Sequence, residues 1–167
     1  MIEQGDMVIY RNRGMYRVER IGKLDFGGVD KKKEYFTLSS MENPKETAYV
    51  PVEGTTIRKP ISQEQAQGLI DTVDDIETIW VQNERLREQE YKKCVASGNC
   101  RDWIRILKTL YSRDKKRGTM TAMDKKYLEM AERALFGEFS FVLHISEKDI
   151  KSFLKQHSDY SSDLASG

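Results

Sequence analysis

Residues 7–14 read Met-Val-Ile-Tyr-Arg-Asn-Arg-Gly, and they decide the fold of the first part of the chain. The first four of these residues favour β-strands. Gly14 tolerates the positive φ of a tight turn. After the turn, Tyr16 and Val18 alternate with polar side chains, so one face of a second strand can be buried. The stretch therefore predicts a β-hairpin.

Two more strands are predicted at residues 34–41 and 47–53, on either side of an Asn-Pro turn. Pro51 cannot donate a backbone hydrogen bond, so the last strand should lie at an edge of the sheet. Four or five short strands within residues 1–60 are typical of a small SH3-like or Tudor-like β-barrel. An open edge could also accept a strand from a partner. The aromatic residues are interpreted mainly as core, with a ligand cage as the alternative: Tyr10, Tyr16, Tyr35, Phe36 and Tyr49.

Helical periodicity replaces this pattern after Pro60 and lasts almost to the end of the chain. Residues suited to cap a helix precede four of the expected helices: Ser62, Asn99, Thr121 and Ser146. The prediction is a five-helix domain over residues 61–157, followed by a flexible tail over residues 158–167. The fold class is therefore α+β, with a small SH3/Tudor-like β-barrel at residues 1–60 and a C-terminal five-helix domain.

The second helix is predicted to be long, because apolar residues recur at helical spacing between residues 76 and 95. Asp74 and Asp75 come just before them, where acidic residues favour a helix start. On this interpretation Trp80 packs in the core beside Ile76. The third helix is predicted over residues 99–118, with a basic stripe opposite its apolar face: Arg101, Arg105, Lys108, Arg113, Lys115, Lys116 and Arg117.

Charge is distributed unevenly along the chain, although the formal net charge is only +1. Residues 61–90 carry 2 Lys and Arg against 8 Asp and Glu, a net of −6, whereas residues 91–136 carry 12 against 5, a net of +7. The basic block is a candidate surface for phosphate or for an acidic protein, and a solvated helix face is the alternative.

The sequence shows no catalytic or metal-binding motif. His144 and His157 are far apart and are interpreted as surface or capping residues. Cys94 and Cys100 have neither redox nor zinc spacing, and we expect reduced, partly buried thiols on different helices. No apolar run approaches the roughly 20 residues of a membrane helix, and no apolar signal region precedes the first strand. We therefore expect a cytoplasmic, non-enzymatic protein with no cofactor, no membrane contact and no small-molecule substrate.

Several strings, taken in order, resemble the CarD family (CarD/CdnL/TRCF) of bacterial transcription regulators. They are GD with VIY at 5–10, EYFTL at 34–38, Val50-Pro51, ASG at 96–98, LKTLYSRDKKRG at 107–118, the Thr121 cap with Lys125, and LFGEF at 135–139. The resemblance covers nearly the whole chain. It implies an N-terminal Tudor-like domain that docks on the β subunit of RNA polymerase, and a helical domain that contacts promoter DNA. Such proteins stabilise the open promoter complex.

Position by position, the resemblance implies two sets of contact residues. The RNA polymerase-binding set is Lys23, Leu24, Tyr49, Val50 and Pro51. The resemblance gives Lys125 as a DNA contact, and its expected neighbours Lys126, Arg85 and Arg87 complete the DNA-binding set. Phosphate contacts of this kind carry no base information, so DNA binding should be non-specific and steeply salt-dependent.

The chain departs from the family pattern at both surfaces. Family members often carry arginines where this chain has Leu24 and Tyr49, so docking on the polymerase should be more apolar here. The string Tyr-Arg-Asn-Arg-Gly at residues 10–14 replaces Tyr-Pro-x-His-Gly and adds two cations. Glu84 stands where well-studied members place a tryptophan wedge for the minor groove. Trp80, one helical turn earlier, is interpreted as core, with a wedge role as the alternative. Phosphate contact is therefore the better supported contribution to DNA binding.

The alternative function is a non-enzymatic protein-interaction module. In that case the Tudor-like domain binds a peptide, and the helical bundle binds protein rather than DNA. The arrangement of charge separates the two interpretations, because DNA binding requires the basic block to converge on one face with Lys125.

Overall fold

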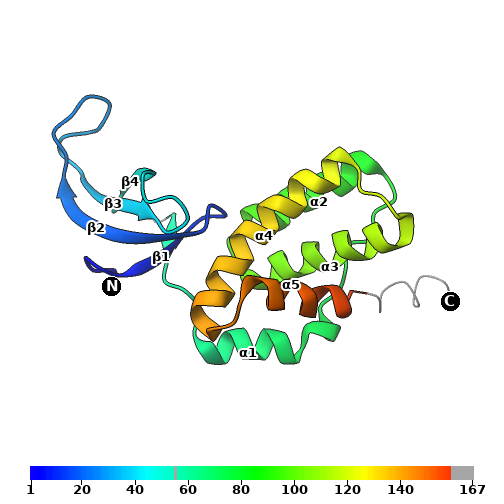
Figure 1. Ribbon diagram of the computed structural model, residues 1–167. Helices are drawn as coiled ribbons and strands as arrows, with labels where there is room; N and C mark the ends of the chain where they lie inside the picture. Colours follow the sequence, from blue (N-terminus) through cyan, green and yellow to red (C-terminus); the bar gives the residue numbers. More distant parts are fainter. Residues whose placement is uncertain (55, 159–167) are drawn as a thin grey trace. The chain divides into compact units, whose positions relative to one another are not determined.

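The computed structural model describes residues 1–54 and 56–158 of the 167-residue chain. The chain divides into two compact units, unit 1 at residues 1–60 and unit 2 at residues 61–167, and each is described by itself (Figure 1). Strands build the first unit and helices build the second. This is the α+β class that the sequence predicts.

Unit 1 is a five-stranded antiparallel sheet with the strand order β4-β3-β2-β1-β5. The strands are β1 (Met7–Tyr10), β2 (Met15–Lys23), β3 (Glu34–Ser40), β4 (Thr47–Pro51) and β5 (Ile57–Arg58). The predicted hairpin is confirmed, because Met7 pairs with Arg17 and Ile9 pairs with Met15. β4 lies at an edge of the sheet, as the proline in it predicts.

Aromatic and aliphatic side chains fill the core of unit 1. Tyr16 and Phe36 are buried, and the Tyr16 hydroxyl donates to the Glu46 carboxylate over 3.0 Å. The prediction that the aromatic residues are core is wrong for Tyr49, whose side chain is 45% exposed. Side chains alternate across a strand, and the neighbouring Val50 takes the inward position.

In the described residues, unit 2 consists of a short 3-10 helix, η1, and five α-helices. Their bounds are α1 (Gln63–Asp71), η1 (Val73–Asp75), α2 (Glu84–Ala96), α3 (Cys100–Arg117), α4 (Ala122–Leu143) and α5 (Glu147–Gln156). The four predicted caps are confirmed, since each side chain accepts a hydrogen bond from a backbone N–H of the first turn: Ser62, Asn99, Thr121 and Ser146.

Helices α3 and α4 form the centre of unit 2, and the other helices pack against them (Figure 1). Trp103 of α3 is fully buried, and its indole N–H donates to the carbonyl of Val95 in α2. The first residue of the unit is anchored as well. The Ile61 N–H donates over 2.9 Å to the buried carboxylate of Glu138, which also accepts from the Cys100 thiol over 3.2 Å. The entry of the chain into unit 2 is thus tied to α3 and α4.

The prediction of a long second helix is wrong. After η1 the chain is not helical over residues 76–83, and α2 begins only at Glu84. We call residues 76–83 the strap. Ile76 and Ile79 of the strap are buried, but Trp80 is 61% exposed. The predicted place of Trp80 in the core is therefore wrong too.

The predicted flexible tail requires a correction at its first residue. Ser158 is buried, and its hydroxyl donates to the carbonyl of Leu154. The rest of the predicted tail, residues 159–167, lies outside the described residues.

Cys94 in α2 and Cys100 in α3 are free thiols on different helices, as predicted, and both are buried rather than partly buried. Burial raises the pKa of the Cys94 thiol, which makes it a poor nucleophile. Within residues 1–54 and 56–158, no helix combines the length and the apolar character needed to cross a membrane.

Candidate docking surface and nucleic-acid interface

The five residues expected to face RNA polymerase differ in their exposure. Lys23 ends β2 and Leu24 follows it, while Tyr49, Val50 and Pro51 form the end of β4. Lys23, Tyr49 and Pro51 are exposed, whereas Leu24 and Val50 are only 6% and 4% exposed. The two buried residues therefore belong to the core, and the other three can offer their side chains to a partner.

Strand register places the two groups at the same end of the sheet, because Glu34 of β3 is opposite Lys23 and Tyr35 is opposite Pro51. Phe26, in the loop after β2, is 42% exposed, and its ring packs edge-on against Tyr49 with centroids 4.9 Å apart. We call Phe26 and Tyr49 the aromatic pair. Exposed aromatic residues of this kind are enriched at protein interfaces. Sequence reasoning missed Phe26, since the Gly-Gly that follows it indicates only a loop.

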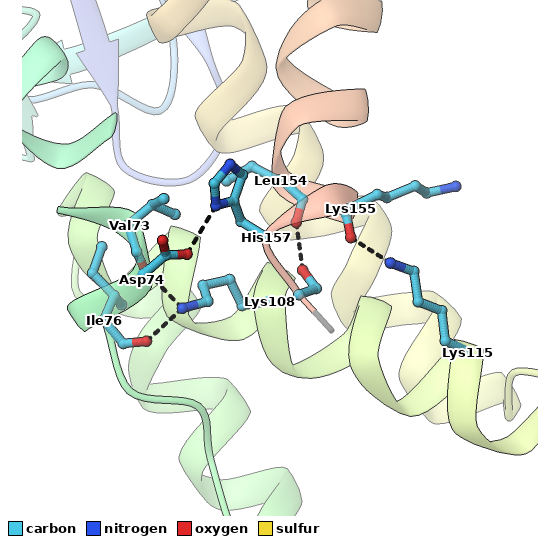
Figure 2. A network of polar contacts seen from close by, with 9 residues as sticks. Val73, Asp74, Ile76, Lys108, Lys115, Leu154, Lys155 and His157 are labelled. Carbon is cyan, nitrogen blue, oxygen red and sulfur yellow. Dashed lines mark hydrogen bonds and ion pairs between the residues drawn. The ribbon is translucent and has the colours of Figure 1, made fainter. Parts of the chain in front are cut away.

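The sequence pattern assigns Lys108 to the exposed basic stripe of α3, and this assignment is wrong. Lys108 is 2% exposed, and its ammonium donates to the carbonyls of Val73 over 2.7 Å and Ile76 over 2.8 Å (Figure 2). Burial lowers the pKa of Lys108, although the nearby aspartates oppose that shift. Beside it, Asp74 Oδ1 lies 2.8 Å from His157 Nδ1. These contacts fix η1 and the start of the strap to α3, and they fix η1 to the end of α5.

Two further side chains hold the rest of the strap. The Thr109 hydroxyl accepts from the Ile79 N–H over 2.9 Å. Arg87 is 8% exposed, and its guanidinium donates to the carbonyls of Val81 over 3.2 Å and Gln82 over 3.3 Å. Strap N–H and carbonyl groups that form no helical hydrogen bonds are thus hydrogen-bonded to side chains of α2 and α3. Arg87 was expected to contact DNA, but its burial and its carbonyl partners make it a structural residue instead.

The strap presents Trp80 to solvent at the point where its neighbours on both sides are anchored. The ammonium of Lys116, in the last turn of α3, lies 5.8 Å from the centroid of the Trp80 ring. This is the distance of a cation–π contact. An exposed aromatic side chain thus stands beside the basic end of α3, which the sequence pattern did not indicate.

The other three residues expected to contact DNA are exposed. Arg85 lies in the first turn of α2, and Lys125 and Lys126 lie near the start of α4. The ammonium of Lys126 is 5.3 Å from the centroid of the Tyr127 ring. Helix N-termini offer free backbone N–H groups and the positive end of the helix dipole, so these cations stand where phosphate is favoured.

Polar contacts bring the start of α2, the end of α3 and the start of α4 together. Arg113 Nε lies 3.0 Å from Asp124 Oδ2, which links α3 to α4. The Tyr127 hydroxyl donates over 2.9 Å to Glu88 of α2. Burial, followed by this hydrogen bond, raises the pKa of Tyr127 to about 12. We call the exposed cations that these contacts gather the cationic end: Arg85, Lys116, Arg117, Lys125 and Lys126.

Five other cations of the basic block lie elsewhere. Lys92 and Lys93 are in the last turns of α2, and Arg101 and Arg105 are in the first turns of α3. The Lys115 ammonium donates to the carbonyl of Lys155 in α5 (Figure 2). Only part of the +7 block therefore converges with Lys125.

A metal centre finds no support in the part of the chain that the structure describes, where no group of three or more His, Cys, Asp and Glu residues could hold an ion. His144 ends α4 in the left-handed conformation, which fits the capping role expected of it. His157 is at the end of α5 beside Asp74.

Two protein-family models match the chain. The model of the CarD-like/TRCF RID domain matches residues 2–61, and the model of the CarD C-terminal domain matches residues 60–155. The RID domain has a Tudor-like fold, which agrees with the five-stranded sheet of unit 1. No curated protein matches the chain.

Proposed function

This chain belongs to the CarD family of non-enzymatic transcription factors that interact with RNA polymerase, and we propose that it docks on the polymerase β subunit and contacts promoter DNA. Unit 1 makes the protein contact, and unit 2 makes the DNA contact. The division follows from two exposed features, the aromatic pair of unit 1 and the cationic end of unit 2. With both contacts made, the protein modulates the stability of the open complex.

Docking is assigned to the aromatic pair, with Lys23 and Pro51 at the same end of the sheet. Two rings already in contact can bury apolar area against a partner while losing little side-chain freedom. β4 is also an edge strand, whose outer backbone groups can pair with a strand of the partner. Leu24 and Val50 support this surface from the core. Apolar contact is thus the main source of docking affinity, and Lys23 adds charge.

The convergence of cations from three helices is the observation that carries the DNA contact. If each of the five residues of the cationic end neutralises one phosphate, log affinity should fall against log salt with a slope of about −4 to −5. Backbone contacts of this kind read no sequence. Trp80 adds an aromatic surface beside Lys116 on which an exposed base can stack.

Modulation of the open complex requires only a difference in affinity. A protein held on the polymerase that binds opened DNA better than closed DNA shifts the equilibrium by that difference. A tenfold preference corresponds to about 1.4 kcal/mol. Whether transcription rises or falls then depends on which step limits the promoter.

The substitution Lys125→Glu tests the DNA contact. It reverses one exposed charge near the N-terminus of α4, where phosphate is favoured. We expect the lifetime of the open complex to fall about five- to tenfold, because an attraction to phosphate becomes a repulsion. Binding to an isolated β-subunit lobe should not change, since unit 1 is untouched.

The matched control is Lys92→Glu, because Lys92 is also exposed but lies near the other end of α2. This control should leave the open-complex lifetime unchanged. Equal lifetimes for Lys125→Glu and the parent protein would exclude the cationic end as the DNA surface. Together with intact polymerase binding, that result would favour an interaction module whose helical unit binds protein.

A further inference from the structure

A cleft with a volume of about 730 Å³ is bordered by the strap, the start of α2 and the second half of α3. Its size is within the roughly 300–1,000 Å³ of small-molecule sites. Its lining combines apolar and hydroxyl side chains: Ile79, Trp80, Val81, Thr78, Thr109 and Ser112. Apolar and aromatic walls with a few polar groups are typical of small-molecule sites.

Cations outnumber carboxylates around this cleft. Arg87, Arg113, Lys116 and Arg117 line it, whereas Glu84 contributes one carboxylate. Arg87 is bonded to strap carbonyls, and Arg113 is paired with an aspartate of α4. Lys116 and Arg117 are the exposed cations that can meet a ligand. The balance of charge favours an anion.

The aromatic wall of the cleft is held in place before any ligand arrives. On one side of Trp80 the Ile79 N–H donates a hydrogen bond to Thr109, and on the other side the Val81 carbonyl accepts one from Arg87. With the backbone held on both sides and the ring in contact with Lys116, the indole loses less freedom on binding than a side chain on an unanchored loop would. The indole is 61% exposed, which leaves ring surface for a second planar group.

From this combination we infer that the cleft binds a nucleoside phosphate, whose base stacks on Trp80 and whose phosphates lie against Lys116 and Arg117. An inorganic anion would use only the cations, and an apolar molecule would use only the ring. The ligand is a free nucleotide or a nucleotide of a melted DNA strand. The second source rests on the proposed function, and the first does not.

Titration calorimetry of the full chain with ATP, tripolyphosphate and adenosine separates the contributions of ring and charge. ATP should bind at least about tenfold more tightly than either of the other two, because only ATP engages both the ring and the cations. ATP should also quench Trp80 fluorescence, whereas Trp103 is fully buried and serves as an internal reference. Equal affinity for ATP and tripolyphosphate would overturn the inference, since charge alone would then explain binding.

Substitutions at exposed positions test the two walls separately. Trp80→Leu removes the ring, and Lys116→Ala combined with Arg117→Ala removes the cations. Each change should weaken ATP binding about tenfold. The matched control is Lys92→Ala combined with Lys93→Ala, which removes the same charge from the other end of α2 and should leave the affinity unchanged. An equal loss in the control would overturn the inference, because it would mean that only net charge matters.

Competition identifies the source of the nucleotide. Displacement of ATP by oligothymidylate at a lower concentration than by a blunt duplex of equal length assigns the cleft to melted DNA, because both can reach Lys116 and Arg117 but only the single strand offers an exposed base. Equal displacement by the two assigns the cleft to a free nucleotide, because shared charge then explains the competition. Retention of ATP in the presence of oligothymidylate assigns it to a free nucleotide. If neither ATP nor oligothymidylate binds while duplex binding still depends on Lys125, the inference is wrong and the proposed function stands. If duplex binding is absent as well, both the inference and the proposed function are wrong.

Discussion

Lys108 donates to two backbone carbonyls from inside unit 2, so its removal should destabilise that unit. Lys108→Met keeps the apolar stem but leaves the carbonyls of Val73 and Ile76 without their charged donor. We expect the free energy of unfolding to fall by about 2–3 kcal/mol, measured by urea denaturation followed by circular dichroism. The exposed control Lys92→Met should change it by less than about 0.5 kcal/mol. A loss no larger than in the control would show that these bonds contribute nothing.

The sequence could not distinguish Lys108 from Lys116, although both lie on α3. A helical pattern shows which residues neighbour the apolar face, and it assigns both lysines to the polar side. Lys108 can be buried because its ammonium donates to the carbonyls of residues 73 and 76, which lie more than thirty positions earlier in the chain. Lys116 is exposed, and it lies beside Trp80 of the strap. Roles that depend on distant backbone leave no local signal.

At the level of elements, the end of α3 depends on Gly118, which has a φ of 73°. A Cβ at this residue would have no atom within 4 Å, so the strain of Gly118→Ala is conformational. We expect a loss of about 1 kcal/mol in the free energy of unfolding. Gly68→Ala, inside α1 and equally uncrowded, should instead stabilise the protein by up to about 1 kcal/mol. Thermal denaturation of the two variants measures both changes in stability. A shift of the midpoint in the same direction for both would contradict this account.

Elements defined by local chemistry were predictable, whereas the strap was not. The strands of unit 1 follow from alternation and from turn residues such as Gly14, and the helix starts follow from capping side chains. The strap carries Ile76, Ile79 and Trp80 at helical spacing, so its local pattern favours a helix. Side chains of α2 and α3 satisfy its backbone instead. The exposed aromatic residue of the candidate site was missed for this reason.

At the level of the whole molecule, each unit contains a buried tyrosine that should make it sensitive to alkali. Burial and the hydrogen bond to Glu46 raise the pKa of Tyr16 from 10.0 to about 12, and burial with Glu88 does the same for Tyr127. Between these values the unfolded chain loses protons that the folded chain keeps, so stability falls as pH rises from 10 to about 12. Urea denaturation at several pH values should show this slope. Tyr16→Phe and Tyr127→Phe should each flatten it, and an unchanged slope in both would refute the assignment.

The two binding surfaces should act together, because the units are joined directly at residues 60 and 61. Docking through unit 1 places unit 2 at an effective concentration of the order of millimolar, which exceeds the roughly 10⁻⁴–10⁻⁶ M dissociation constants of non-specific DNA binding. Phe26→Ala combined with Tyr49→Ala should therefore abolish the effect on open-complex lifetime while leaving the duplex affinity of the free protein unchanged. Tyr49→Phe keeps the aromatic pair and is the control.

Adding Lys125→Glu to this docking variant should cause no further loss of open-complex lifetime. An undocked unit 2 at submicromolar concentration leaves most promoters unoccupied, so weakening its DNA contact changes almost nothing. In the protein that still docks, unit 2 is held on the DNA most of the time. Lys125→Glu then weakens a contact that is being made, so the open-complex lifetime falls. The two changes should thus be strongly non-additive in a double-mutant cycle of lifetimes. Additive losses would mean that each surface acts on its own, and that docking does not deliver the helical unit to DNA.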